Sequence, residues 1–477
     1  MSERSLAGIT EYPRSKVEAD DAVFSLIRDG KGKRLAVRGN TAGFEGAERS
    51  GALLCPLSPV NAAVLRERLP WLRPQPLGLK SSAGCGDRLG LATPGHIQAV
   101  RSAGNIAPIF AQQSMRENNR TGRSVQEVLD DAMWGVFQEG WREPWGADAD
   151  HLKTTADVDL CVAAGYTFYT VDPGDHVDNE AHTAPMEVLV DKVHALPWDG
   201  LEDTPDRLHQ RYLGVEFQVE DLELVFDETT LARAAAKYGR AIAHTTRMYR
   251  HLTSAMGGRT FELEVSVDET ETPTSPHEHY FVANELRRMG VQWVSLAPRY
   301  VGRFEKGVDY IGDLDTFDDD LAKHAAIARV LGPYKLSIHS GSDKFSIYPS
   351  FARHAGNLVH LKTAGTSYLE ALRTIACVEP ALFRKILPFA LECWAEDKAT
   401  YHVSADPNKV RRPEELADAE LIAVLDQFDG REVLHVTFGS VLERFGSELL
   451  SVLDSNEDAY YAALKVHFDR HLAPFVK

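Results

Sequence analysis

Two histidines end neighbouring strand-like runs in the second half of this sequence. In YKLSIHSGSD, apolar and polar residues alternate, so His339 shares a strand face with Lys335 and Ser337. By the same count, His360 and Lys362 share a face in LVHLKTAGTSY. A neutral imidazole at a strand end suits a divalent ion, which makes His339 and His360 candidate metal ligands. The alternative is a pair of core histidines with satisfied hydrogen bonds.

Carboxylates follow the same alternation in FELEVSVDET. Its apolar residues share one face, which places Glu264 and Asp268 on the other, and Glu269 follows at the strand end, where it could swing into a site. A buried carboxylate is costly unless it is paired or binds a metal. Glu264 and Glu269 are therefore candidates for a metal ligand or a general acid/base, and a salt bridge from Glu264 to Lys335 is the alternative.

An adjacent Asp-His pair follows another strand-like run, YTFYT. Asp175 and His176 lie in VDPGDHVDN, and together they could supply an acid/base group and a metal ligand from one loop. The alternative is a polar Pro-Gly turn without a chemical role.

Two further segments could bind an anionic or hydroxylated substrate. HSGSDKFS is similar to a backbone-rich anion-binding loop, in which Ser340 and Asp343 are substrate-binding candidates. PRYVGRFEKG places Arg299 and Arg303 after another strand, and a guanidinium group binds a planar carboxylate in bidentate fashion. A surface salt bridge is the alternative for either arginine.

The elements that position these residues indicate a parallel barrel. Buried parallel strands are nearly all apolar, so polar residues that recur at strand ends suggest a barrel whose mouth does chemistry. Helical stretches such as SVQEVLDDAMWGVFQEGW alternate with the strand candidates. We therefore predict an α/β fold, a TIM-like (β/α)8 barrel with an N-terminal cap region and insertions.

The number of strand candidates exceeds the eight positions of such a barrel. At least two of the ten must be caps, edge hairpins or errors; the ten are 86–92, 106–113, 148–154, 166–175, four runs between 261 and 367, 400–406 and 433–440. The proline-rich stretch LPWLRPQPLG indicates a boundary. It separates an expected cap or lobe at 1–80 from a barrel domain at 81–477, with an insertion at about 177–260.

Composition limits the classes of partner. The chain has 477 residues, and its net charge of -18 opposes binding to nucleic acid. No apolar run is long enough to cross a bilayer, and the N-terminal segment lacks the apolar core of a signal peptide, so we expect a cytoplasmic protein without a membrane partner. The five scattered cysteines indicate reduced thiols. The sequence leaves open whether the protein forms a homo-oligomer.

Several of these motifs together resemble the tagaturonate epimerase family. They are SVDET, SLAPRYVGRFEKGVDYIGDL, GPYKLSIHSGSDKFSIYP and LVHLKTAGTSYLEALR, and the resemblance extends upstream through TVDPGDHVDN and GDRLGLATPGH to cover roughly residues 80 to 410. It implies a divalent-metal-dependent isomerase with a TIM-like barrel that interconverts tagaturonate and fructuronate. Some relatives also act on the neutral ketohexoses fructose and tagatose.

The chemistry of this reaction constrains the mechanism. The two sugar acids differ at ketose carbon 4, whose hydrogen lies beta to the ketone, so its removal gains no direct enolate resonance. Retro-aldol cleavage between carbons 3 and 4, followed by re-addition, avoids that step. Carbonyl migration and hydride transfer are the alternatives, but the chain has no dinucleotide fingerprint, and a metal fits retro-aldol chemistry as a Lewis acid.

This interpretation gives each candidate residue a role. His176, His339 and His360 would bind a divalent cation such as Mn, Co, Ni or Zn, while Asp175 and Glu264 would exchange the proton of the carbon 4 hydroxyl. Lys362, or one of the arginines, would bind the substrate carboxylate. A metal-dependent aldolase and a non-catalytic sugar-acid-binding protein are the alternative functions, and the sequence does not separate a uronate from a neutral ketose.

Overall fold

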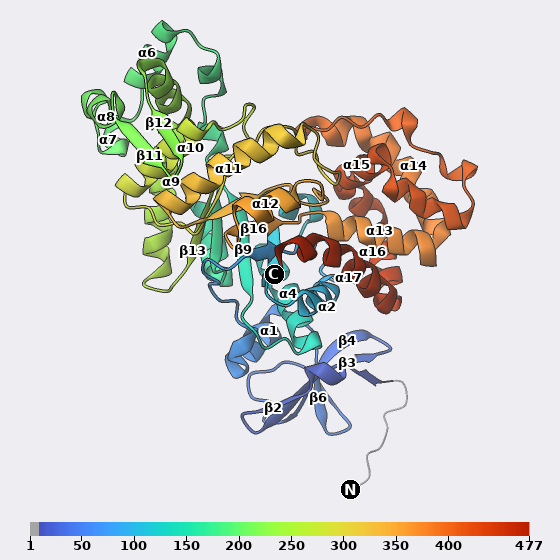
Figure 1. The fold of residues 1–477 in the computed structure, drawn as a ribbon. Coiled ribbons are helices and arrows are strands. Elements are labelled where there is room, and N and C mark those ends of the chain that lie inside the picture. Colours follow the sequence, from blue (N-terminus) through green and yellow to red (C-terminus); the bar gives the residue numbers. More distant parts are fainter. Residues whose placement is uncertain (1–8, 477) are drawn as a thin grey trace.

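Eight parallel strands close into a barrel at the centre of the molecule (Figure 1). The structure is a computed structural model that describes residues 9–476. The strands run in the order β10, β13, β14, β15, β16, β7, β8 and β9 around the ring. Their bounds are β7 Ser82–Gly84, β8 Ala107–Ser114, β9 Gly146–Leu152, β10 Phe168–Val171, β13 Glu262–Ser266, β14 Ser295–Ala297, β15 Lys335–Ile338 and β16 Val359–Lys362. The predicted TIM-like barrel is confirmed.

Helices cover the outside of the barrel and follow the strands in turn. They include α2 Thr93–Ala103, α3 Met115–Thr121, α4 Val125–Glu139, α5 Thr155–Ala164, α9 Glu228–Met256, α10 Pro276–Arg288, α11 Leu314–Leu331, α12 Tyr348–His354 and α13 Thr366–Val378. Capping boxes at Ser124, Thr154 and Ser275 fix where three of these helices begin. Polar residues at the carboxyl ends of the strands are thereby held at one mouth of the barrel.

Three of the ten strand candidates are wrong. The first barrel strand is β7, just upstream of the expected span 86–92, which forms the loop before α2. The span 400–406 is irregular chain after the short 3-10 helix η5 Lys398–Thr400, and 433–440 lies in α15 Phe428–Val436 and α16 Phe438–Ser455. Short apolar runs fit the helical and the strand period alike, and here the helical period applies.

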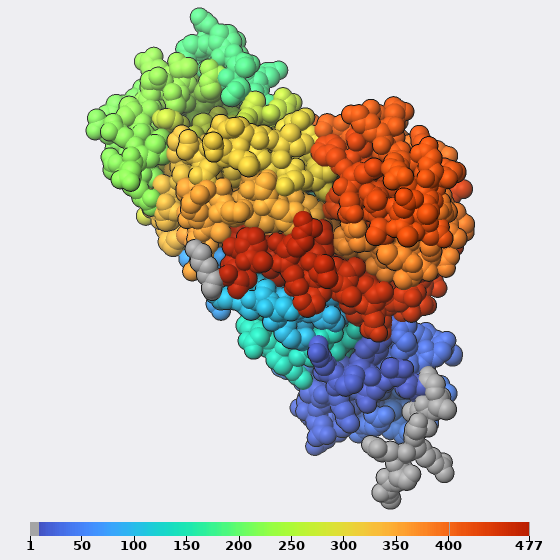
Figure 2. All heavy atoms as spheres, turned by 45° about the vertical axis from the view of Figure 1, so that its right-hand side comes forward, coloured from blue at the N-terminus to red at the C-terminus, as the bar shows by residue number. Residues whose placement is uncertain are grey.

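An antiparallel sheet forms the N-terminal part of the chain. Its strands are β1 Thr10–Glu11, β2 Val17–Ala19, β3 Ala22–Asp29, β4 Gly32–Gly39, β5 Ala47–Arg49 and β6 Ala52–Cys55, and α1 Pro59–Arg68 follows. The sheet projects as a separate lobe at one end of the molecule (Figure 2). The segment after α1 closes the floor of the barrel, because Gly78 donates its N–H to Glu262 and accepts a hydrogen bond from Lys335.

Two more regions extend the barrel. Between β10 and β13 lie α6 Met186–His194, α7 Trp198–Leu201, α8 Pro205–Tyr212 and the hairpin of β11 Glu216–Val219 and β12 Leu222–Val225, at the far end of the molecule from the N-terminal lobe (Figure 1). After β16 the chain is helical and includes α14 Pro380–Asp397 and α17 Glu457–Leu472. The sequence did not predict this helical C-terminal region. The division into domains at residue 80, with an insertion at 177–260, stays a prediction.

Two features of composition have structural counterparts. All five cysteines are free thiols. No helix within residues 9–476 combines the length and the apolar character needed to span a membrane. The prediction of a cytoplasmic location rests on the N-terminal segment of the sequence. The first eight residues of that segment, 1–8, lie outside the described residues.

Candidate active site

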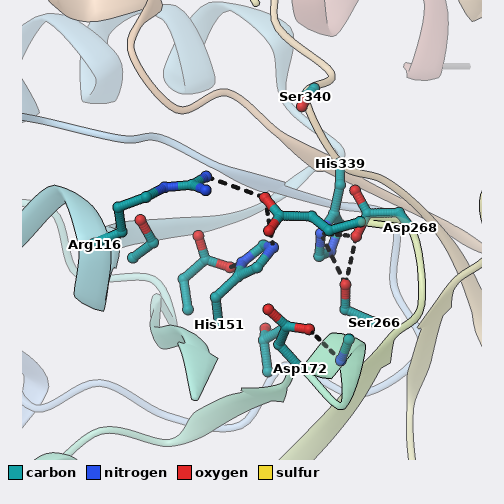
Figure 3. Close-up of polar contacts among 12 residues, drawn as sticks. Arg116, His151, Asp172, Ser266, Asp268, His339 and Ser340 are labelled. Carbon is teal, nitrogen blue, oxygen red and sulfur yellow. Dashed lines mark hydrogen bonds and ion pairs between the residues drawn. The ribbon is translucent and has the colours of Figure 1, made fainter. Parts of the chain in front are cut away.

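Three side chains from three strands meet at the mouth of the barrel. The ligand atoms of His151, Asp268 and His339 all lie within 4.8 Å of one another, and Figure 3 shows the three side chains gathered there. His339 Nδ1 is 3.1 Å from Asp268 Oδ1, and the His151 and His339 rings are 5.0 Å apart. His151 also belongs to a second group with Asp172 and Glu269. Two imidazoles beside carboxylates form a donor set that suits a divalent transition metal.

A carboxylate orients each of the two histidines. His339 Nε2 lies 2.6 Å from Glu264 Oε1, and His151 Nδ1 lies 2.8 Å from Asp150 Oδ1. These contacts leave His339 Nδ1 and His151 Nε2 to face the cluster. Histidines that bind metals are commonly oriented in this way, by a carboxylate at the opposite ring nitrogen.

The electrostatics of the cluster favour a bound cation. Burial opposes a positive charge on His151, but Asp150 outweighs it and raises the pKa of His151 to about 10. Burial also opposes a charge on His339, and Asp268 raises its pKa to about 9. Both imidazole rings are therefore in the protonated, positively charged form at neutral pH when no metal is bound. A metal would displace these protons, and its affinity would fall as the pH is lowered.

Lys362 joins the two orienting carboxylates inside the barrel. Its Nζ lies 2.6 Å from Asp150 Oδ1, 2.8 Å from Glu264 Oε1 and 2.8 Å from Asp148 Oδ2. This placement differs from the predicted contact with the substrate carboxylate, because three carboxylates already surround the ammonium group. Glu264 is paired with Lys362 and not with Lys335, so the alternative salt bridge to Lys335 is not formed.

His360 lies away from the group of His151, Asp268 and His339. Its Nδ1 is 2.8 Å from Ser82 Oγ, its ring packs against Phe168, and burial lowers its pKa to about 3. Among residues 9–476, no group of three close ligand atoms includes His360. His339 therefore meets His151 and Asp268, and not its predicted partner His360, because the side chain of His360 starts lower in the barrel.

Asp175 and His176 lie outside the barrel mouth. Asp175 is 68% exposed and forms an ion pair of 2.8 Å with Lys153, while His176 stacks on His244 of α9. Both line an open hollow of about 750 Å³ beside the insertion. Asp172, at the very end of the strand, reaches His151 instead. The Pro-Gly turn after Asp172 carries the predicted pair away from the cluster.

A cavity of about 600 Å³ opens directly onto Asp268 and His339. Four of the predicted site residues line it together with Asp268 and His339; these are Glu269, Arg299, Arg303 and Ser340. A small adjoining pocket of about 40 Å³, called the narrow base below, shares Arg116 and Lys306 with the cavity and is also lined by His151. The sequence analysis did not single out these three residues.

Asp343 lies behind the cavity rather than in its wall. Its carboxylate is 2.8 Å from both Arg431 and His467, and its N–H donates to His471 Nε2. Asp343, His467 and His471 are also close enough to hold a metal, but Arg431 and the hydrogen bond to His471 already engage them. This network ties α17 to the loop after β15, and Asp343 does not line the cavity.

A backbone irregularity explains why the sequence analysis missed His151. Strict alternation would turn Asp150 and His151 to opposite faces of β9. The pairing of β9 with β10 shifts register there, and His151 adopts a left-handed backbone with φ of 57°. Both side chains consequently serve the cluster, and no residue pattern in DADHLKT marks the bulge.

A closed parallel barrel with buried histidines and carboxylates at the carboxyl ends of its strands is the architecture of an enzyme. Residues 12–475 match the sequence profile of the family described as UxaE, tagaturonate epimerase, and the chain therefore belongs to this family. The resemblance found in the sequence motifs is confirmed.

Individual relatives cover nearly the whole chain. The chain is 44% identical over 475 residues to the tagaturonate/fructuronate epimerase of Thermotoga maritima, which covers 98% of this chain and 96% of the relative. The native crystal structure of fructuronate-tagaturonate epimerase UxaE from Cohnella laeviribosi superimposes with a TM-score of 0.94 at 39% identity, covering 98% of this chain and 97% of that one. A complex of that enzyme with one glycerol gives a TM-score of 0.93 at 39% identity and covers 98% and 96%.

Proposed function

We propose that this protein interconverts tagaturonate and fructuronate by inverting ketose carbon 4, with a divalent cation bound by His151, Asp268 and His339. Family membership supports the reaction. The observation that supports the cation is the pair of histidines, each oriented by its own buried carboxylate. When bound, such a cation would act as a Lewis acid toward the ketone and its neighbouring hydroxyl.

The side chains around the cavity are suited to retro-aldol chemistry. The reaction begins with loss of the proton on the carbon 4 oxygen, and Glu269 is the carboxylate best placed to accept it. Burial opposes a charge on Glu269, but His151 and Arg116 lower its pKa, so it is ionised at neutral pH. Cleavage of the bond between carbons 3 and 4 leaves a three-carbon aldehyde and a three-carbon enediolate, which takes the electron pair of the broken bond. The aldehyde rotates and presents its other face, and the enediolate carbon adds to that face to form the bond again. Glu269 then returns the proton to the new hydroxyl.

Glu264 has a different part in this proposal. It is fully buried, and its oxygen contacts His339 and Lys362 rather than the cavity. Glu264 therefore acts through His339 as a positioning residue. Asp175 pairs with Lys153 and faces the other hollow, so it has no part in the proton transfer in this arrangement.

The test combines metal removal with a pair of histidine variants. Chelator-treated protein should lose activity on tagaturonate and regain it with Mn, Co, Ni or Zn, and fructose and tagatose should be assayed alongside. His151→Ala should lose metal binding in calorimetry and lose activity. His176→Ala is the matched control and should keep both. Full activity in verified metal-free protein, or metal binding unchanged in His151→Ala, would contradict the proposal.

A further inference from the structure

The narrow base of the cavity brings two cations next to the metal cluster. Arg116, at the start of α3, and Lys306, in the loop after β14, line this base together with His151, Asp268 and His339. Figure 3 shows Arg116 reaching toward the cluster from the side. A small molecule held at the metal would therefore also lie within reach of both cations.

Lys306 has no carboxylate partner within the described part of the chain. Its Nζ donates a hydrogen bond of 2.5 Å to Ser340 Oγ, and Ser340 directly follows His339. Burial lowers the pKa of Lys306, and Arg116 lowers it further, against the opposite effect of Glu269 and Asp268. A desolvated ammonium without a close anion is unfavourable, and an incoming carboxylate would remove that cost.

Arg116 is only partly engaged. One end of its guanidinium forms an ion pair of 3.0 Å with Glu269, and its Nε is buried without a hydrogen-bond partner. The guanidinium lies 5.3 Å from the ring centre of Tyr401, which limits its movement. Planar donors that remain open on a guanidinium suit the two oxygens of a carboxylate.

The other cations of the cavity are less well placed. Arg303 is exposed at the rim and pairs with Glu305 at 3.2 Å, so solvent screens its charge. Arg299 donates to the carbonyl oxygen of Tyr300 and lines the wider part of the cavity, not the base beside the metal ligands. Lys362 is enclosed by three carboxylates, and their negative charges would repel an incoming anion.

We infer that Lys306 and Arg116 form a subsite for the carboxylate of the sugar acid, and that Lys306 is the residue that separates uronates from neutral ketohexoses. This inference rests on the proposed function, since it assigns the two ends of one substrate to the metal cluster and to the cation pair.

The experiment compares Lys306→Met, Lys306→Arg and the exposed control Lys385→Met with the unmodified protein. The measurements are kcat and KM for fructuronate and fructose, and the binding of both sugars to chelator-treated protein by calorimetry. Lys306→Met should weaken fructuronate binding and raise its KM by about 30-fold or more, as expected for loss of a buried charge-assisted contact. Fructose constants should stay within about threefold. Lys306→Arg should retain most fructuronate binding, because it keeps the charge.

The outcomes separate this inference from the proposed function. Equal losses on fructuronate and fructose in Lys306→Met, or no loss on fructuronate, would overturn the subsite. A protein that binds fructuronate no better than fructose before any substitution would overturn it as well. Absence of turnover would contradict the epimerase proposal alone, since the calorimetric comparison does not require catalysis. Metal affinity and thermal unfolding of Lys306→Met should match the unmodified protein, which shows that the loop around Ser340 is intact.

Discussion

Lys362 shows how one buried side chain can connect the carboxylates that orient two histidines of a site. It binds Asp150 and Glu264, and these carboxylates set the orientation of His151 and His339. Its own pKa is well above the usual range, because Asp148, Asp150 and Glu264 outweigh the effect of burial. The cation and the two carboxylates therefore form one unit with the histidines.

This arrangement predicts the effect of removing the ammonium group. Lys362→Met should lower the affinity for Zn or Mn by about 10- to 100-fold, the usual effect of losing a contact that orients metal-binding histidines. Titration calorimetry measures the change, and thermal unfolding checks the fold. Lys335→Met, which removes a lysine lower in the same barrel, should leave metal affinity close to normal. Unchanged metal affinity with a selective loss of fructuronate turnover would instead indicate a direct contact with the substrate carboxylate.

At the scale of elements, the alternation of apolar and polar residues predicted most of the barrel. The runs at 106–113, 148–154 and 166–175, and the four runs after residue 261, all contain barrel strands. The pattern failed where tertiary context decides. Val433 and Val436 pack as one face of a helix, and the bulge in β9 turns His151 into the site against its period.

A second element-scale feature is a pair of buried acids beside the mouth. Glu305, in the loop after β14, and Glu432, in α15, both accept a hydrogen bond from the N–H of Ser404. Ser404 belongs to the segment that also places Tyr401 at the cavity. Burial, followed by the hydrogen bond to Glu305, raises the pKa of Glu432 from 4.5 to about 8. The three segments thus meet at these two carboxyl groups.

The raised pKa of Glu432 makes stability depend on pH. In the unfolded chain Glu432 ionises near 4.5, so its contribution is complete below that pH and is lost as the pH rises toward 8. The free energy of unfolding should therefore fall by roughly 2–4 kcal/mol between pH 5 and 8.5 through this group. Denaturant unfolding of Glu432→Gln, which mimics the protonated acid, should show a smaller fall. Exposed Glu415→Gln should behave like the unmodified protein, and the same fall in Glu432→Gln would show that another group causes it.

At the scale of the whole molecule, segments that are distant in the sequence line the cavity together. Arg116, Arg299, Ser340 and Tyr401 all line one cavity, although they come from α3, two barrel loops and the helical C-terminal region. A retro-aldol route needs this enclosure, because the aldehyde must turn over without leaving.

Isotopic labelling tests whether the enclosure serves that route. Retro-aldol epimerisation breaks no carbon-hydrogen bond at carbon 4. Fructuronate deuterated at carbon 4 should show no primary isotope effect and should keep its label in tagaturonate, which mass spectrometry measures. Solvent hydrogen at carbon 4 would indicate proton transfer at carbon. Free three-carbon products during turnover would indicate an aldolase.

The position of Lys362 also bears on the order in which the protein becomes functional during its synthesis. The three proposed metal ligands lie in or just after the third, fifth and seventh barrel strands in chain order and have all been synthesised once residue 339 is made. The lysine that holds their orienting carboxylates in place belongs to β16, the last strand, which pairs with β7 to complete the ring. Until that pairing forms, the carboxylates repel one another and the histidines lack a fixed orientation. With the proposed cation, tight metal binding would therefore require the completed barrel.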